Sequence, residues 1–580
     1  MITKKYFDKF NNFFANFLYI IGNQNKKKLI KIFLINLIIS IFEFLSISLI
    51  IPIIVLLVKN DISVYLSFSP SLQSFMNSLS LNNQIIFILI IINIIFLIRY
   101  FLIVNFNKTK IRFINRVFEN ISGKVFIGNI LSSYESLIGF SSSEIVKNIY
   151  HECVEFNKNI LSTIISISGE TMKIIAILTI LLWVDYFAVI SGVLFFVIFS
   201  LLFLGYQKAK MKIWGIDSLI SFEKIIQFIN EGFASIKEIK LIKNKTFFFD
   251  HYKFHLNKFT DSKFKKEVIS QIARPLLELF FIILITFFIL IKIYLSNSSK
   301  DIIILLSIFT LGFVRLLPCT MKIINDIQSI FYSLATIESI KKRILNFHEL
   351  ENKKEIVDDN LNKINSIELE KINYLYPNTN KDIIKDFSIR LEKGKIYGLN
   401  GVSGSGKTTL ISIMMGFLKP LSGTIKINDK VSSIYDNQYY FSKISYVPQK
   451  IFIANDTLKN NISLGEKKKE INNENLNKLI DLINLKDLNM KLEKNSEMLS
   501  EMGKNISEGQ KQRIGFARAL YLDRQIIFLD EFTSSLDSKN EKQLISKILD
   551  LKKDKIIIII AHDINVLNIC DEIIQLKNVT

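Results

Sequence analysis

Cysteine, proline, glycine and tryptophan are all scarce in this chain of 580 residues, with 3 Cys, 7 Pro, 21 Gly and 2 Trp. The cysteines Cys153, Cys319 and Cys570 lie far apart, which excludes a disulfide framework and a zinc site. So little proline and glycine excludes collagen-like and low-complexity chains. The first residues lack the apolar region and cleavage site of a signal peptide, so no cleaved signal is expected.

Acidic residues are also outnumbered, since 73 Lys and Arg face 53 Asp and Glu, for a net charge of +20. Nucleic-acid binding would gather these cations on one patch beside aromatic residues. The lysines are scattered instead, so no nucleic-acid partner is expected. Hydrophobic residues, by contrast, make up 49% of the chain, and Phe alone occurs 48 times. This composition favours a membrane protein with a soluble appendage.

Long apolar runs are abundant before about residue 335. Each meets or approaches the length of about 20 residues that a helix needs to cross a bilayer. The six runs cover 29–58, 85–104, 160–182, 187–204, 275–293, and 302–317 and onward. We therefore predict six transmembrane helices.

The charge of the connections orients these spans. The N-terminal stretch and the long intervals at about 105–159 and 206–270 are basic, whereas the other connections are nearly neutral. By the positive-inside rule, both termini and both intervals are predicted to be cytoplasmic. The intervals keep helical apolar spacing, which favours helices that continue out of the membrane and return. Independent soluble inserts are the alternative.

The composition changes after Glu351. Residues 346–365 are polar and are predicted to link a transmembrane domain at 1–345 to a second domain at 366–580. In the second domain, short β-like runs alternate with helical stretches. This alternation predicts an α/β domain with a mainly parallel sheet.

A phosphate-binding loop follows one of these predicted strands. The sequence GVSGSGKTT fits the pattern GxxxxGK[ST] from Gly401 to Thr408, after the strand KIYGL. Its glycines allow backbone N–H groups to surround a phosphate at a helix N-terminus. Lys407 would reach the β- and γ-phosphates, and the Thr408 hydroxyl would bind Mg²⁺. The residues expected to bind the nucleotide here are Gly401, Ser403, Gly404, Ser405, Gly406, Lys407, Thr408 and Thr409.

An acidic pair ends a second predicted strand. The apolar run IIFL is followed by Asp530 and Glu531. One acidic residue at such a place can simply cap a helix, but two of them after a phosphate loop favour catalysis. Asp530 suits the magnesium site, and Glu531 suits polarising the attacking water. The fold class expected is therefore a six-span α-helical membrane domain plus an α/β P-loop nucleotide-binding domain.

Five further segments complete an ordered set with the phosphate loop and the acidic pair. They are INYLYP at 372–377, YVPQ at 446–449, ISEGQKQR at 506–513, SSLD at 534–537 and AHD at 561–563. The set resembles the nucleotide-binding domain of ATP-binding cassette (ABC) transporters of the exporter type, over about residues 367–576.

The resemblance assigns roles to single residues. It implies that Tyr376 stacks on adenine, that Gln449 senses Mg²⁺ and binds it with Thr408 and Asp530, and that His562 contacts the γ-phosphate. It also implies that the chain hydrolyses ATP with Mg²⁺, with Glu531, His562 and Gln449 as the catalytic residues. Asp537 belongs to the segment called the D-loop in this family. The signature residues that would complete the site of an opposite domain are Ser507, Glu508, Gly509 and Gln510.

One signature residue departs from the family pattern. Glu508 occupies the first glycine position of the usual LSGGQ, and a carboxylate aimed at a phosphate would repel it. We expect its side chain to point away; otherwise hydrolysis would be slow or altered. Because the signature acts on another copy, one such domain with six spans makes a half-transporter, for which a homodimer is the simplest closure. A heterodimer is the alternative.

Ionisable residues within the apolar runs are candidates for binding the transported substrate, because they are costly in a membrane. Arg99 and Arg274 lie at run ends, where their side chains could equally reach the membrane interface. Arg315 lies deeper, and basic side chains would suit an anionic head group such as a pyrophosphate. The candidates are Arg315, Glu43, Arg99, Lys173 and Arg274.

Two membrane segments extend the resemblance. FEFLSISLIIPII at 42–54 and FVRLLPCTMKI at 313–323 are similar to segments of flippases for lipid-linked oligosaccharides. This implies ATP-driven translocation of a polyprenyl-pyrophosphate glycan across the bacterial cytoplasmic membrane, with membrane lipid around a multi-pass protein. The alternative is an ABC exporter of another lipid, a peptide or a hydrophobic drug.

Overall fold

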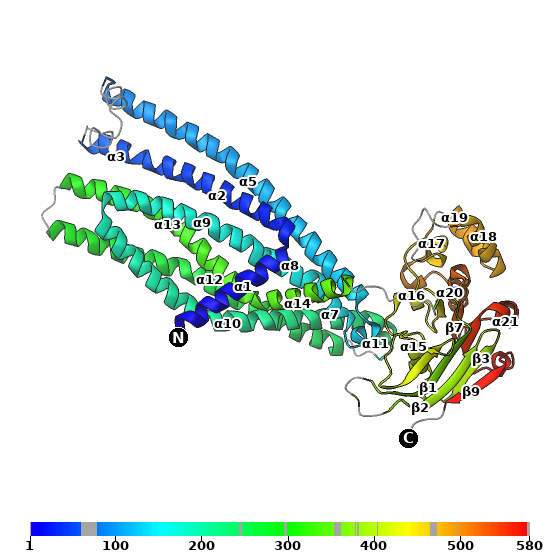
Figure 1. The fold of residues 1–580 in the computed structure, drawn as a ribbon. Helices are drawn as coiled ribbons and strands as arrows, with labels where there is room; N and C mark the ends of the chain where they lie inside the picture. Colours follow the sequence, from blue (N-terminus) through cyan, green and yellow to red (C-terminus); the bar gives the residue numbers. More distant parts are fainter. Residues whose placement is uncertain are drawn as a thin grey trace. The chain divides into compact units, whose positions relative to one another are not determined.

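The computed structural model describes residues 2–59, 78–242, 246–294, 299–352, 361–376, 379, 382–402, 404–464, 472–495 and 497–576. It divides into two compact units (Figure 1). The N-terminal unit comprises Met1–Ser132 and Phe140–Asn352, and the C-terminal unit comprises Ser133–Gly139 and Lys353–Thr580.

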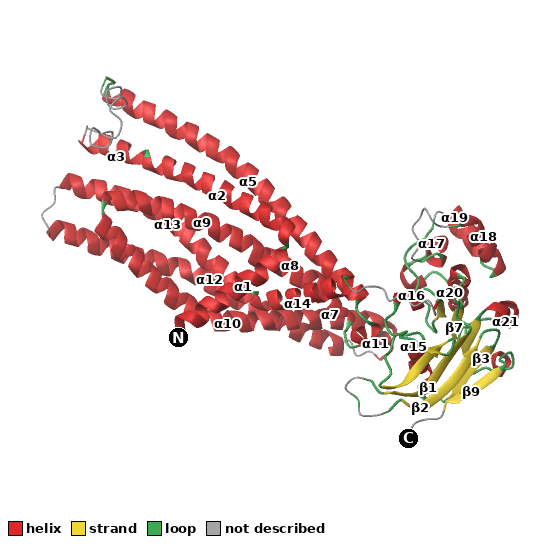
Figure 2. Ribbon diagram, viewed as in Figure 1, coloured by secondary structure: helices red, strands yellow, loops and turns green. Residues whose placement is uncertain are grey.

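The N-terminal unit is helical (Figure 2), and six of its helical stretches are long and apolar enough to cross a membrane, which confirms the predicted spans. The helices that carry them are α2 (Asn23–Ser48) with α3 (Ile50–Lys59), α5 (Leu81–Leu131), α9 (Ser162–Val184), α10 (Tyr186–Ala234), α12 (Thr246–Tyr294) and α13 (Ser299–Tyr332). The other helices of this unit are α1 (Ile2–Ile21), α7 (Ser142–Val146), α8 (Glu152–Phe156), α11 (Ile236–Ile242) and α14 (Leu334–Glu351), with the π-helical turns Lys147–His151 and Asn157–Leu161.

The longest helices reach far beyond a bilayer. Helix α5 has 51 residues, and α10 and α12 have 49 each. At 1.5 Å per residue these are about 75 Å long, against an apolar core of about 30 Å. The two basic intervals are therefore helical continuations of the spans, as predicted. Helix α14 also continues to Glu351, so the first part of the predicted linker at 346–365 is helical.

Polar contacts fix how the membrane helices pack. The Asn36 amide of α2 donates to the Ile165 carbonyl at 3.2 Å, and a Cβ at Gly169 of α9 would lie only 3.1 Å from that amide group. The buried Gln328 of α13 donates to Gln207 of α10 at 2.7 Å. Buried side-chain amides with partners hold helices in one register, because slippage would leave them unpaired.

The C-terminal unit contains two sheets. A five-stranded parallel sheet has the order β6-β7-β8-β3-β9, which confirms the predicted α/β domain. A four-stranded antiparallel sheet has the order β2-β1-β4-β5. The strands are β1 (Ser366–Tyr374), β2 (Ile384–Glu392), β3 (Ile396–Gly401), β4 (Ser422–Ile427), β5 (Lys430–Val431), β6 (Ile444–Val447), β7 (Ile526–Asp530), β8 (Ile556–Ile560) and β9 (Glu572–Leu576).

Helices flank these sheets. Every residue of the central strands β7 and β8 is buried, as expected for a parallel sheet covered on both faces. The helices of this unit are α6 (Tyr134–Ile138), α15 (Lys407–Met414), α16 (Gln438–Phe441), α17 (Leu458–Ile462), α18 (Asn473–Leu482), α19 (Lys486–Lys494), α20 (Glu508–Leu522), α21 (Ser538–Leu551) and α22 (Ile564–Leu567), with 3₁₀ turns at Glu501–Gly503 and Lys552–Asp554.

Candidate nucleotide site and membrane charge clusters

The predicted phosphate loop connects strand β3 to the N-terminus of α15. Gly404 and Gly406 have φ of +83° and +87°, values that other residues rarely adopt. A Cβ at Gly406 would also lie 3.1 Å from the Ile383 carbonyl oxygen. Lys407 Nζ donates to the carbonyls of Gly401 and Val402 at 2.7 and 3.1 Å. The loop is therefore wrapped around its own lysine.

The side chains of this loop suit a phosphate ligand. Ser405 Oγ is buried and has no hydrogen-bond partner within the described part of the chain. Such orphaned polar atoms are rare in folded proteins and require an explanation, which a phosphate oxygen would supply. Thr408 is exposed in the first turn of α15, and Thr409 shares a 3.0 Å hydrogen bond with the Tyr376 hydroxyl. Ser403 lies outside the described residues.

Three predicted catalytic side chains meet beside strand β7. The Gln449 amide donates to Glu531 Oε2 at 2.6 Å, and His562 Nε2 lies 3.6 Å from Glu531 Oε1. Glu531 is held in the left-handed region at φ +46°, with its N–H bonded to the Ile560 carbonyl at 3.0 Å. A non-glycine residue in this conformation is uncommon and often found at functional sites.

Asp530 is the last residue of strand β7, and its side chain is buried. Burial, and then the charge of Glu531, raise the pKa of the Asp530 carboxyl, while the Tyr446 hydroxyl at 3.5 Å and Lys407 oppose the shift. The raised pKa means that the ionised form is poorly stabilised by the protein alone. A bound cation would remove that deficit.

The residues predicted to hold Mg²⁺, Thr408, Gln449 and Asp530, would offer hydroxyl, amide and carboxylate oxygens, the ligand types that suit this hard cation. The Gln449 NH₂ group is engaged with Glu531, so its carbonyl oxygen is the atom left for a metal. When bound, Mg²⁺ would neutralise phosphate charge.

The signature segment begins helix α20. Ser507 caps this helix in a capping box with Gln510, at 3.2 and 2.9 Å. The Glu508 carboxylate is 71% exposed and pairs with Lys511 at 2.8 Å. A Cβ at Gly509 would lie only 2.8 Å from the Ser535 carbonyl oxygen. The second glycine position is thus required by the fold of this same chain, and the first is not.

The D-loop is anchored by a residue that sequence reasoning missed. Gln512 of α20 donates to Ser534 Oγ at 2.8 Å and accepts from the Ser535 N–H at 3.0 Å. Asp537 lies at the N-terminus of α21, where a hydrogen bond from Asn540 lowers its pKa. Gln512 is part of the segment ISEGQKQR, but only the tertiary contact reveals its role.

A second missed residue lies on the short helix α6. Glu135 accepts hydrogen bonds from the Tyr374 and Tyr435 hydroxyls at 3.3 and 3.2 Å. The Tyr134 ring lies 5.2 Å from the Phe417 ring. Although α6 falls between membrane helices in the chain, these contacts place it within the C-terminal unit.

Three of the predicted substrate residues come together among the membrane helices. Glu43 of α2 is buried and forms ion pairs with Arg99 of α5 and, at 3.7 Å, with Arg315 of α13. Both guanidinium groups lie about 6 Å from the Phe96 ring, a contact that stabilises cations. This arginine cluster, Glu43, Phe96, Arg99 and Arg315, has two cations for one carboxylate.

The other two predicted substrate residues, Lys173 and Arg274, pair with other carboxylates. Lys173 pairs with Glu170 of the same helix at 2.9 Å, and Lys322 of α13 reaches that carboxylate at 3.5 Å. This lysine cluster, Glu170, Lys173 and Lys322, has Lys110 and Asp326 as further charged neighbours. Arg274 pairs with Glu278 one turn away, and its side chain is 68% exposed.

Comparison with known proteins finds similarity to ABC transporters. Residues 384–534 match the family model described as "ABC transporter". The chain is 32% identical over 274 residues to the "Probable ABC transporter ATP-binding/permease protein" of Haemophilus influenzae, covering 47% of this chain and 49% of that one. It is also 36% identical over 215 residues to the "Lactococcin-G-processing and transport ATP-binding protein LagD" of Lactococcus lactis, covering 36% and 30%. The chain thus spans about half the length of the first relative and less of the second.

One solved structure resembles the whole chain. The "Structure of a bacterial Atm1-family ABC exporter with ATP bound" aligns with a TM-score of 0.75 at 16% identity, over 96% of this chain and 94% of the other. The likeness establishes the fold. Domains of the matched family bind and hydrolyse ATP with Mg²⁺. The chain has the fold of an ABC exporter, with a multi-pass membrane domain of six helices and an ABC-type ATP-binding domain.

Proposed function

We propose that the protein is an ATP-driven exporter of a bacterial cytoplasmic membrane, working as a homodimer with both termini in the cytoplasm. The observation that carries this proposal is the grouping of Gln449, Glu531 and His562 beside the phosphate loop, in a chain with six spans. Glu531 orients and polarises the attacking water, and His562 lies against the same carboxylate. Gln449 connects Glu531 to the Mg²⁺ position.

The substrate class proposed is a lipid-linked oligosaccharide, carried on a polyprenyl pyrophosphate. The arginine cluster supports it, because its surplus positive charge suits a pyrophosphate. Arg99 Nε is also buried with no hydrogen-bond partner in the described chain, so a donor is available for an anionic oxygen. Peptide export is the second candidate, because LagD, whose name refers to lactococcin-G processing and transport, is among the similar proteins.

Reconstitution in liposomes tests this proposal. Full-length protein is supplied with fluorescent undecaprenyl-pyrophosphate glycan, and ATP-dependent movement between leaflets is measured, with Glu531→Gln as the inactive control. Transfer by the wild type alone supports the proposal. Transfer that does not depend on ATP, or selective stimulation of ATP hydrolysis by peptides, contradicts it.

The arginine cluster has its own test and control. Arg315→Ala is expected to reduce glycolipid-stimulated ATP hydrolysis and leave the basal rate unchanged. Arg274→Ala is the matched control, because that side chain is exposed and pairs with Glu278 of its own helix. An equal loss of basal and stimulated rates in Arg315→Ala would indicate a structural role for Arg315.

A further inference from the structure

Tyr374, the last residue of strand β1, is a buried residue with a polar tip. Its side chain is only 1% exposed, and its hydroxyl donates to Glu135 Oε1 of α6 at 3.3 Å. A buried tyrosine hydroxyl requires such a partner, because leaving it unpaired costs free energy. The tip of the Tyr374 ring is therefore held by a residue that lies 239 positions earlier in the chain.

The Tyr374 ring also contacts Tyr376, the ring predicted to stack on adenine. Side chains two residues apart in extended backbone project to the same side, and Tyr376 lies two residues beyond Tyr374. The two ring centroids are 5.3 Å apart, and the ring planes meet at 84°. Aromatic pairs favour this edge-to-face arrangement, so Tyr374 restricts the orientation of the Tyr376 ring.

Tyr376 has two further attachments. Its hydroxyl shares a 3.0 Å hydrogen bond with Thr409 Oγ1 of α15, and its carbonyl accepts from the Thr379 N–H at 3.1 Å. The Tyr376 side chain is half-buried, so part of it remains accessible to a ligand. A ring that is already held in one orientation loses little conformational freedom when a base stacks on it, and this favours binding.

The backbone of Tyr374 contacts a segment that packs on the phosphate loop. Its carbonyl accepts from the Ile383 N–H at 2.9 Å, and the Ile383 carbonyl oxygen lies 3.1 Å from the position of a Cβ at Gly406. A phenylalanine in place of Tyr374 would keep these backbone contacts and the aromatic ring. The substitution Tyr374→Phe therefore removes the bond to Glu135 and leaves the rest of the arrangement in place.

We propose that Glu135 and Tyr374 are positioning residues for ATP, which hold the Tyr376 ring in the orientation that the adenine base needs. The inference rests on the ATP-binding part of the proposed function and is independent of the transported substrate. Coupling between two sites is reciprocal at equilibrium. A nucleotide that stacks on Tyr376 must therefore also strengthen the attachment of α6 to the C-terminal unit.

The nucleotide affinity of the full-length protein tests this assignment. Tyr374→Phe should raise the KM for ATP, and the dissociation constant of the non-hydrolysable analogue AMP-PNP with Mg²⁺, about fivefold, while kcat changes by less than about twofold. Tyr435→Phe is the matched control, because it removes the other tyrosine hydroxyl that bonds to Glu135, at 3.2 Å. Of these two tyrosines, Tyr374 is the one whose ring contacts Tyr376 within the described residues. Inorganic tripolyphosphate, which has no base, should inhibit the wild type and both variants equally.

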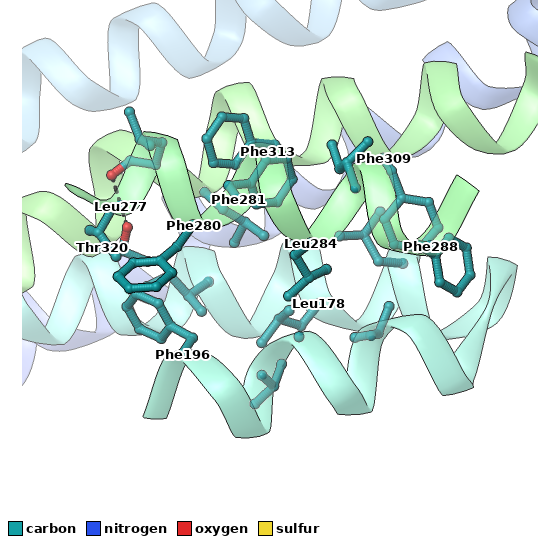
Figure 3. A pocket seen from close by; sticks show the side chains of 18 of the residues that line it. Leu178, Phe196, Leu277, Phe280, Phe281, Leu284, Phe288, Phe309, Phe313 and Thr320 are labelled. Carbon is teal, nitrogen blue, oxygen red and sulfur yellow. Dashed lines mark hydrogen bonds between the residues drawn. The ribbon is translucent and has the colours of Figure 1, made fainter. Parts of the chain in front are cut away.

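Amide hydrogen exchange at 133–139 supplies the reciprocal measurement. AMP-PNP with Mg²⁺ should slow this exchange in the wild type and leave it nearly unchanged in Tyr374→Phe. Leu178→Ala is the control for a general loss of stability. Leu178 lines an apolar cavity of about 380 Å³ among the membrane helices (Figure 3), and its truncation enlarges that cavity. This variant should have a lower melting temperature and the nucleotide affinity of the wild type.

The outcomes separate this inference from the proposed function. Unchanged nucleotide affinity in Tyr374→Phe would overturn the assignment, as would an equal loss in Tyr435→Phe or Leu178→Ala, or weaker inhibition of Tyr374→Phe by tripolyphosphate. If Tyr374→Phe does not fold, Glu135→Ala takes its place and should show the same rise in the dissociation constant. The expected affinities without glycan transfer in liposomes contradict the proposed function alone. Glycan transfer with unchanged affinities contradicts the positioning role alone.

Discussion

Glu508 and Gly509 are neighbours at the start of α20, and their surroundings differ in the room left for a side chain. The Ser535 carbonyl oxygen lies 2.8 Å from the position of a Gly509 Cβ, closer than real Cβ contacts allow, whereas Glu508 extends into solvent. We expect Gly509→Ala to displace the D-loop and lower ATP hydrolysis by about tenfold or more. Glu508→Gly should stay within about threefold of wild type, because glycine costs an exposed helix position only about 1 kcal/mol. Comparable losses in both variants would contradict this reading.

The predicted role of Asp530 in binding Mg²⁺ requires an ionised carboxylate, and ionisation of this buried group lowers the stability of the folded protein. Burial raises its pKa, so the ionised form destabilises the folded protein at neutral pH relative to the unfolded chain. As the pH falls through the raised pKa, the folded state takes up the proton first and the penalty disappears. Asp530→Asn should therefore raise the melting temperature of the nucleotide-free protein at pH 7 and abolish Mg²⁺-dependent hydrolysis. Calorimetry in EDTA should show the gain at pH 7 shrink at acidic pH; an equal gain at both would exclude the carboxylate as its source.

Helix α6 is held in the C-terminal unit by the Glu135 carboxylate, which lies between two tyrosine hydroxyls, and by the Tyr134–Phe417 ring contact. Burial raises the pKa of Tyr374 and of Tyr435, so both hydroxyls keep their protons and donate to Glu135 throughout the neutral range. Glu135→Ala removes both charge-assisted bonds, and amide hydrogen exchange at 133–139 should become faster by about tenfold. The exposed Glu238→Ala on α11 is the control. Unchanged exchange at 133–139 would show that the Tyr134–Phe417 contact is sufficient.

The helices and strands differ in how well their own sequence predicts them. The six spans and the central strands could be predicted, because twenty apolar residues or a fully buried Ile-rich strand are set by composition alone. Strand β2, Ile384–Glu392, carries no comparable signal, because it has polar residues on its exposed face and pairs in an antiparallel sheet. The end of α14 at Glu351 was likewise missed, because a polar surface helix and a polar linker have similar compositions.

Across the whole molecule, the grouping of nucleotide-site residues could be predicted, whereas the membrane clusters could be predicted only in part, through the charged residues Glu43, Arg99 and Arg315. Gln449, Glu531 and His562 occur in spaced motifs, so their meeting could be inferred before the fold was known. Lys322 and Phe96 join their clusters only through helix packing, and no local pattern marks them. Glu135 is equally invisible in sequence, because its partners lie more than two hundred residues away.

The proposed homodimer makes a further prediction about how sites are shared between chains. If each site joins the phosphate loop of one chain to the signature of its partner, Lys407→Ala and a signature variant should each be inactive alone. Ser507→Asp is the suitable signature variant, because aspartate keeps the helix cap while placing a negative charge toward the phosphate. Co-expression of the two should restore about a quarter of wild-type hydrolysis, because half of randomly paired dimers are mixed and each mixed dimer holds one intact site out of two.

Tandem affinity tags isolate the mixed dimers, and their failure to hydrolyse ATP would show that the sites are not shared or that one site alone is insufficient. The double variant Lys407→Ala/Ser507→Asp mixed with wild type distinguishes the two: shared sites leave its mixed dimers with no intact site, whereas unshared sites leave them one.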